Sequence, residues 1–293
     1  MQPRMNVWQQ LVNGLIIGHA YALVAVGWTM LLGAARLVNF GHGQMYMVGA
    51  FVAWWFMSTT GLPYAVAVLA AVAVGALIGA VMQRLLLGLT LSQDLVSLMI
   101  VTLGFGQMLE GGAGLAFGPK PQTLFSPFEQ MSIHIGPVWF TVQDAILVVA
   151  AIAVFLALQF ALTRTTFGTS VRMVAEDPAL TRLGGIRISR VYMGIFAFEG
   201  AAVAFAATLV APRTPILTSM GFDQVIMTFV VVVLGGIGSV GGSYAAGIAI
   251  GLFTALFGAL VSPAYTTAAV FAVLIAVMVL RPGQLAASAS FAR

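Results

Sequence analysis

Three polar residues lie within or between apolar runs of membrane-spanning length. Asn39 and His42 separate two such runs, and Glu199 lies near the middle of the run 191–211. A charged side chain at that depth costs about 2.5–3.5 kcal/mol on insertion scales, so ionisable residues inside a membrane usually have a function. Their chemistry here would be hydrogen bonding and charge pairing along a translocation pathway. The alternative for Glu199 is a protonated carboxyl group that is hydrogen-bonded to a neighbouring hydroxyl.

Two glycine-rich breaks interrupt the apolar pattern, one within 33–49 and the other over 235–242. Backbone that leaves helical geometry inside a membrane must be buried in protein or line a water-filled cavity. Paired broken segments point to the pathway of a transporter. The alternative, an ordinary turn at the membrane surface, stays open for the second break. The predicted pathway residues are Asn39, His42, Gly43, Glu199, Gly235, Gly236 and Gly238.

Signatures of catalysis and of metal binding are missing from the sequence. Lys120 is the only lysine and lies between two prolines, so the chain has no G-x-x-x-x-G-K-[ST] loop to hold ATP phosphates. There is no cysteine, and His19, His42 and His134 form no zinc-binding pattern. We therefore predict that this chain is not an enzyme and has no metal site or cofactor of its own.

Composition indicates a membrane protein. Of the 293 residues, 61% are hydrophobic and only 7% are charged, whereas a soluble domain has about 25% charged residues. The net charge of +4 does not indicate nucleic acid as a partner, because most of the basic residues lie at the ends of apolar runs, where they report topology.

The elements that must position these residues are membrane-spanning helices. A span needs about 20 apolar residues. We predict an all-α polytopic helix bundle of eight or nine spans, forming one transmembrane domain over 1–293, with some segments broken by glycine or re-entrant. Clear spans are predicted at 11–33, 62–83, 95–117, 138–162, 191–211 and 266–280, and shorter or broken ones at 44–60, 223–237 and 243–262.

The distribution of basic residues predicts which loops face the cytoplasm. Five of the twelve lie in the segment 163–190, so this loop is predicted to be cytoplasmic. Arg281 and Arg293 place the C-terminus on the same side, and the proline-rich segment 118–137 is predicted to face outward. The N-terminus lies outside if 44–60 crosses fully, although Arg4 argues against that.

Within the loop 163–190, the sequence predicts a short capped helix. Asp177 is a good N-cap, Pro178 suits the first helical position, and Gly184-Gly185 can end the helix. A simple connection between spans could be far shorter. We therefore predict a docking surface; the alternative is a solvated surface helix without a partner.

A family resemblance runs in order along nearly the whole chain, from about residue 8 to 281. The loop sequence RMVAEDP at 172–178, the segment VNFGHG at 38–43 and the segment VLGGIGS at 233–239 carry it. These stretches resemble the permease subunits of branched-chain amino acid ABC importers, most closely the LivH type, the first of the two permeases. The sequence departs from the family at Thr181, where alanine is usual, and at Gly184, an added glycine.

The resemblance implies partners as well as a fold. Such a permease pairs with a second homologous permease, two cytoplasmic ABC ATPases that bind ATP and Mg, and a periplasmic amino acid-binding protein, in the lipid bilayer of a bacterial inner (plasma) membrane. The short loop helix would be the helix that couples the permease to an ATPase. The residues that the resemblance assigns to coupling are Glu176, Asp177, Pro178, Leu183, Gly185 and Ile186.

Several alternatives remain at the level of sequence. Branched-chain amino acids are the expected solutes, while urea and short amides are handled by close relatives. A stand-alone secondary carrier would need charged coupling residues inside the membrane, and Glu199 is the only deep one. Glu110 and Gln107 share one face of the predicted span 95–117, but Glu110 could simply reach the membrane interface.

Overall fold

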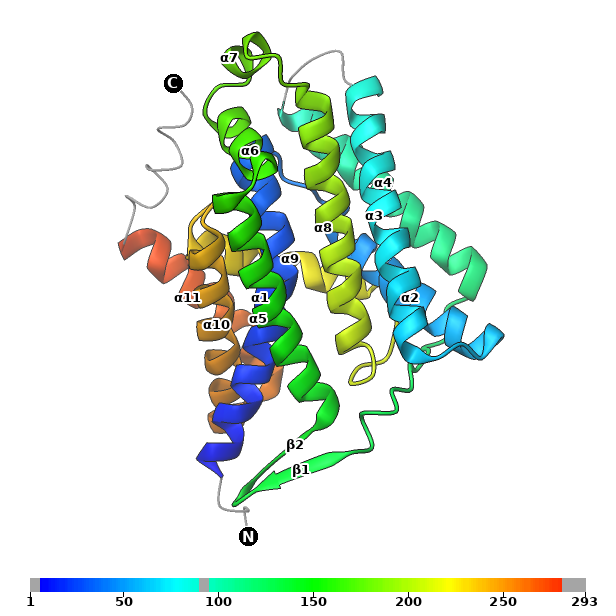
Figure 1. Cartoon of the computed structure of the whole chain (residues 1–293). Helices are drawn as coiled ribbons and strands as arrows, with labels where there is room; N and C mark the ends of the chain where they lie inside the picture. The colour runs from blue at the N-terminus through cyan, green and yellow to red at the C-terminus, as the bar shows by residue number, and fades with distance from the viewer. Residues whose placement is uncertain (1–5, 90–94, 281–293) are drawn as a thin grey trace.

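The structure of the chain is a computed structural model, and it describes residues 6–89 and 95–280. The described segments are helical apart from one β-hairpin and the connections (Figure 1). The helices are α1 (Val7–Ala35), α2 (His42–Thr60), α3 (Tyr64–Leu89), α4 (Leu95–Phe117), α5 (Val142–Arg164), α6 (Thr166–Glu176), α7 (Pro178–Leu183), α8 (Ile188–Val210), α9 (Met220–Gly235), α10 (Val240–Leu260), the 3-10 turn η1 (Pro263–Tyr265) and α11 (Thr266–Leu280).

Seven of the described helical segments are long and apolar enough to cross a membrane. They are Val7–Ala35, Tyr64–Leu85, Val96–Phe117, Val142–Arg164, Ile188–Val210, Val240–Leu260 and Pro263–Leu280. The two remaining predicted segments, 44–60 and 223–237, correspond to α2 and to the shorter apolar helix α9. The polytopic helical bundle is confirmed, and the number of eight or nine spans holds as an approximation.

The predicted span 138–162 begins four residues too early. Residues Ser132–Ile135 and Val138–Thr141 form the antiparallel strands β1 and β2, so the fold is not purely helical. Helix α5 begins only at Val142, because the Thr141 side chain accepts a hydrogen bond from the Asp144 backbone while the Asp144 side chain accepts one from Thr141. This capping box satisfies amide groups that would otherwise lack partners at the helix start.

The hairpin and the loop helices lie at opposite ends of the bundle. In Figure 1, α6 and α7 lie at the top and the hairpin lies at the bottom, beside the beginning of α1. The Gln9 side chain joins α1 to the hairpin, because it donates to the Trp139 carbonyl at 2.8 Å and accepts from the Trp139 amide at 2.9 Å. The segments predicted to face outward and inward are thus on different sides. The predictions for Arg4 and for the C-terminus lie outside the described residues.

Glycine allows two pairs of helices to pack with their backbones in contact. A Cβ atom at Gly75 of α3 would overlap the Gly200 carbonyl of α8, and one at Gly79 would overlap the Phe196 carbonyl. Gly247 and Gly251 of α10 meet Ala22 and Gly18 of α1 in the same way. Both small-residue spacings in the sequence therefore lie at helix contacts, as expected for close packing in a membrane.

Gly75→Val is expected to destabilise the protein by about 1–3 kcal/mol, since the added atoms would force α3 away from α8. Gly112→Val is the matched control, because a Cβ atom at Gly112 of α4 has nothing within 4 Å. Melting temperatures in detergent, read by fluorescence-detected size-exclusion chromatography, would compare the two variants. Equal melting temperatures would contradict the proposed packing.

Candidate functional site

The connection between α1 and α2 brings the first predicted polar residues into the bundle. Arg36 adopts a left-handed conformation with φ of 52°, which ends α1. The Asn39 side chain then accepts a hydrogen bond from the Gly41 amide at 2.9 Å and turns the chain into α2. Short polar side chains that bond to backbone two residues ahead are typical of such turns. Helix α2 therefore begins at His42, inside the protein.

Asn39, His42 and Glu199 meet in one buried cluster. The Asn39 side-chain amide donates to both carboxylate oxygens of Glu199, at 3.1 and 3.2 Å. The His42 Nδ1 atom lies 2.9 Å from Glu199 Oε1. None of the three residues has any exposed surface. The Glu199 carboxylate on α8 is thus hydrogen-bonded by Asn39 and His42 at the beginning of α2. These three side chains link α2 to α8.

An aromatic ring covers the histidine of this cluster. The Trp28 ring of α1 stacks on the His42 ring, with ring centroids 5.1 Å apart and planes inclined by 12°. Trp28 also has no exposed surface. A buried charge or dipole is tolerated when its partners supply hydrogen bonds, and the cluster meets this condition for Glu199. Its side chains are closed to solute in this conformation.

Gly43, the next predicted pathway residue, lies where α2 meets α9. A Cβ atom at Gly43 would overlap the carbonyl oxygen of Gly221, and one at Gly221 would lie 2.7 Å from the Gly43 carbonyl oxygen. No larger side chain fits between these two backbones. Gly43 therefore has a packing role next to the cluster, and its part in a pathway stays a prediction.

The second glycine-rich break forms the turn between α9 and α10. Gly236 and Gly238 have φ angles of 89° and 84°, a conformation that glycine adopts without steric cost. Gly235 packs on the beginning of α10, and a Cβ atom at Gly33 of α1 would lie 2.8 Å from the Cα of Gly238. Among the described residues, this turn shares no hydrogen bond with the Glu199 cluster. The two breaks therefore meet at Gly33 and Gly238, while the described hydrogen bonds of the second break do not reach the Glu199 cluster.

The loop 163–190 contains the predicted capped helix. Asp177 Oδ1 accepts hydrogen bonds from the amides of Ala179 and Leu180, at 2.7 and 3.1 Å, and Pro178 is at the first position of α7. Gly184 ends the helix, and Gly185 follows with φ of 79°. The local conformation predicted from these residue types is confirmed.

The surface of α7 exposes apolar side chains outside the spans. Leu183 is 84% exposed and Leu180 is 64% exposed. Glu176 is also exposed, whereas Ile186 is partly buried. Thr181, the departure from the family pattern, is buried and donates its hydroxyl to the Asp177 carbonyl at 2.7 Å. Thr181 therefore stabilises α7 from its buried side, and its difference from the family's alanine does not alter the exposed surface of the helix.

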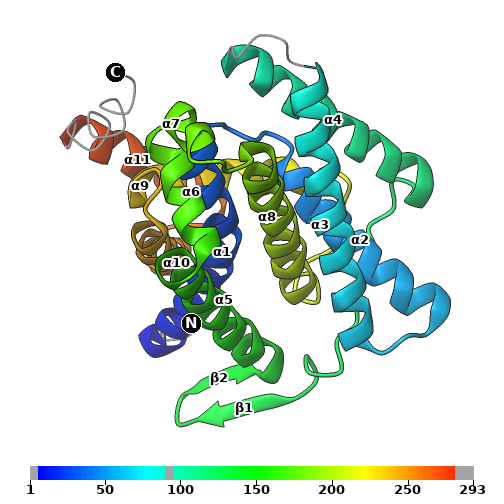
Figure 2. The same ribbon diagram turned by 45° about the horizontal axis from the view of Figure 1, so that its top comes forward.

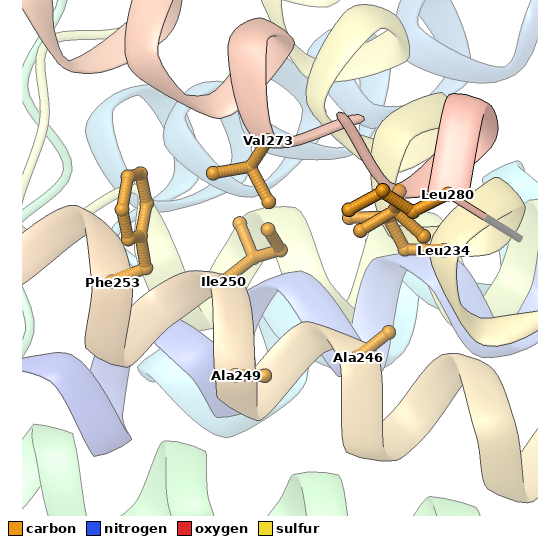
Figure 3. A pocket seen from close by; sticks show the side chains of 8 residues that line it. Leu234, Ala246, Ala249, Ile250, Phe253, Val273 and Leu280 are labelled. Carbon is orange, nitrogen blue, oxygen red and sulfur yellow. The ribbon is translucent and has the colours of Figure 1, made fainter. Parts of the chain in front are cut away.

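A groove between α9, α10 and α11 has a volume of about 450 Å³ (Figure 3). Its lining side chains carry no polar group; they belong to Leu234, Ala246, Ala249, Ile250, Phe253, Val273, Val277 and Leu280. They offer no hydrogen bond to the ammonium or carboxylate of an amino acid. The groove is therefore not a candidate solute site. Among the described residues, no three His, Cys, Asp or Glu side chains are placed to hold a metal ion.

Two buried residues of α1 and α2 were not singled out by the sequence. In the sequence, Trp28 looks like an ordinary apolar residue of a span. No sequence motif indicates that its ring stacks on His42. Gln44 lies two residues after His42 in the same broken segment, and its amide polarity inside an apolar region could have identified it. Its Nε2 atom donates to Glu110 Oε2 of α4 at 3.4 Å.

Known proteins resemble this chain over most of its length. Residues 10–278 match the family described as branched-chain amino acid transport system / permease component. The high-affinity branched-chain amino acid transport system permease protein BraD of Pseudomonas aeruginosa is 31% identical over 257 residues, with 82% of each chain covered. The corresponding permease protein LivH of Escherichia coli K12 is 28% identical, also with 82% of each chain covered.

A second kind of permease protein and one solved structure also match. LivM, another permease protein of the Escherichia coli K12 high-affinity branched-chain amino acid transport system, is 27% identical over 75% of this chain and 57% of its own length. The structure of PsaBC from Streptococcus pneumoniae in complex with Fab covers 92% of this chain and 91% of its own, with a TM-score of 0.47 and 13% identity.

The family match extends from α1 to α11 and includes both the Glu199 cluster and the capped loop helix. Together with seven apolar helices of spanning length, it makes this chain a multi-pass membrane protein. The chain belongs to the family of permease components of branched-chain amino acid ABC transport systems.

Proposed function

We propose that this chain is the membrane-spanning permease subunit of an ABC importer that moves branched-chain or related amino acids across a bacterial inner membrane. It would have no enzymatic activity and no cofactor of its own, and ATP would be hydrolysed by partner ATPases. The loop 163–190 and the C-terminus would face the cytoplasm, which agrees with the excess of arginine in that loop.

The observation that carries the proposal is that α7, in a chain of this family, is a capped helix with exposed apolar side chains. Exposed Leu180 and Leu183 lie on a helix that Asp177 and Gly184 cap at its two ends. Large apolar side chains exposed to water on an ordered element often indicate a protein-binding surface. In our proposal, α7 binds a groove of an ATPase through Leu183, while Glu176, Asp177, Pro178, Gly185 and Ile186 hold its position.

The proposed assembly contains further chains. A second homologous permease would complete the pathway, and two ABC ATPases would bind on the cytoplasmic side. A periplasmic binding protein would deliver the amino acid to the hairpin end of the bundle. Support for the second permease comes from the existence of two permease proteins, LivH and LivM, among the relatives.

Purification from the native membrane in mild detergent would test this function. The eluate is expected to contain a chain with a Walker A motif and to show vanadate-sensitive ATP hydrolysis that the amino acid and its binding protein stimulate. A pure chain without ATPase activity, from a preparation shown to preserve other membrane complexes, would contradict the proposal and favour a stand-alone carrier.

A further inference from the structure

Helix α4 lies at the edge of the bundle and carries polar residues there. It packs mainly on α2 and α3, and Figure 2 shows it away from α1 and α10. Much of its apolar surface is exposed, including Leu115 and Met108. Between these two residues lies Glu110, which is partly exposed, and Gln107 one turn earlier is exposed.

Glu110 lies deeper in its span than the interface position that the sequence left open, and this depth makes contact with lipid unfavourable. It precedes Phe117, the last residue of the span, by seven positions, which is about 10 Å along a helix. A carboxylate at this depth in hydrocarbon is costly and typically faces a partner or a water-filled cavity. No described Lys, Arg or His forms an ion pair with Glu110. Its charge therefore has no cationic partner within the described part of this chain.

Gln44 positions Glu110 and has unused hydrogen-bonding capacity. Its Nε2 atom donates to Glu110 Oε2 at 3.4 Å, which is long for a hydrogen bond. The side chain is only 3% exposed, and its Oε1 atom has no hydrogen-bond partner. Gly106 of α4 is adjacent, since a Cβ atom there would lie 3.1 Å from Gln44 Oε1. A buried carbonyl oxygen without a donor favours a ligand that brings one.

The two intramembrane carboxylates thus differ in their partners. Glu199 accepts from Asn39, lies against His42 and is closed to solvent. Glu110 is reachable from outside the chain and has a single long hydrogen bond among the described residues. Gln107 adds a second carboxamide on the same helix face, three residues before Glu110. One negative charge with neighbouring amide oxygens matches a primary ammonium group, which has three donors and no acceptor.

We propose that Glu110, together with Gln107 and Gln44, forms a subsite for the α-ammonium group of an amino acid in the translocation pathway. The proposal rests on the function proposed above, in which a second permease closes the pathway over α4. It also defines the solute class. A zwitterionic amino acid can bind Glu110 through its cation, whereas urea and simple amides have none. The site therefore favours amino acids over neutral amides.

Uptake by the complete importer in proteoliposomes, with its binding protein and ATP, would test the subsite. Glu110→Gln is expected to lower leucine uptake at least about tenfold, the order expected for losing a hydrogen bond between charged groups. Glu110→Asp is expected to recover part of the rate, because it restores the charge. Gln159→Ala, on the exposed face of α5 and outside both the predicted pathway and the loop 163–190, is the control and should leave uptake unchanged.

The possible results separate the subsite from the function on which it rests. Wild-type leucine uptake by Glu110→Gln would overturn the subsite and leave the importer function intact. Loss of the second permease from the purified Glu110→Gln complex would also overturn it, because Glu110 would then hold the partner permease and not the solute. A wild-type complex that takes up urea but no amino acid, or that shows no ATP-driven uptake, would overturn both proposals.

Discussion

Asp177→Arg combined with Pro178→Gly is expected to abolish solute uptake while the chain still inserts into the membrane. Asp177 Oδ1 caps two backbone amides of α7, and Pro178 starts the helix with a suitable fixed φ. A helix of six residues is too short to be stable by itself. An arginine at its beginning also opposes the helix dipole. Without the helix, Leu180 and Leu183 lose their ordered presentation to an ATPase.

The measurement is uptake of labelled amino acid, together with the amount of ATPase that co-purifies with the variant and the amount of chain in the membrane fraction. Thr163→Arg also places an arginine on this side of the protein, at the exposed end of α5 and away from α7, and should transport normally. Leu183→Ala leaves the cap in place and removes only the exposed apolar contact, so it should also reduce ATPase binding. Wild-type uptake by the double variant would refute the docking role of α7.

Glu199→Ala is expected to lower the stability of the bundle strongly. The substitution removes the acceptor for Asn39 and the partner of His42, and both side chains remain fully buried. Each buried polar group left without a partner costs about 1–3 kcal/mol, and the lost volume adds a cavity. The link between α2 and α8 would be lost in the same step. Thermal unfolding in detergent, followed by size-exclusion chromatography, would measure the change.

Glu199→Gln separates hydrogen bonding from charge in the same cluster. Its carbonyl oxygen can accept from Asn39, and its amide can donate to His42 in the other tautomer, so most of the stability should return. Glu129→Ala, in the outward loop, is the control for loss of a carboxylate elsewhere. A melting temperature of Glu199→Ala equal to that of the wild type would show that the cluster does not hold α2 and α8 together.

Features that depend on neighbours along the chain were predictable from the sequence. The spans follow from apolar length, since a helix satisfies its backbone hydrogen bonds within one segment. The α7 cap follows for the same reason: Asp177 bonds to amides two and three residues ahead. The sequence did not indicate the hairpin at 132–141. Its second strand begins with Val-Trp-Phe, which is as apolar as the span that follows, and Thr141 marks the helix start only through its bond with Asp144.

What the sequence determined by itself is therefore a multi-spanning permease of a known family, with a capped loop helix and with polar residues that had to be explained. What only the tertiary structure decided is how those residues are paired. His42 lies 157 positions from Glu199 along the chain, and Gln44 lies 66 positions from Glu110. Such pairs depend on which helices pack together, and that depends on small-residue contacts such as Gly75 with Gly200. Helix packing satisfies the Glu199 carboxylate inside the bundle and leaves Glu110 open at its edge.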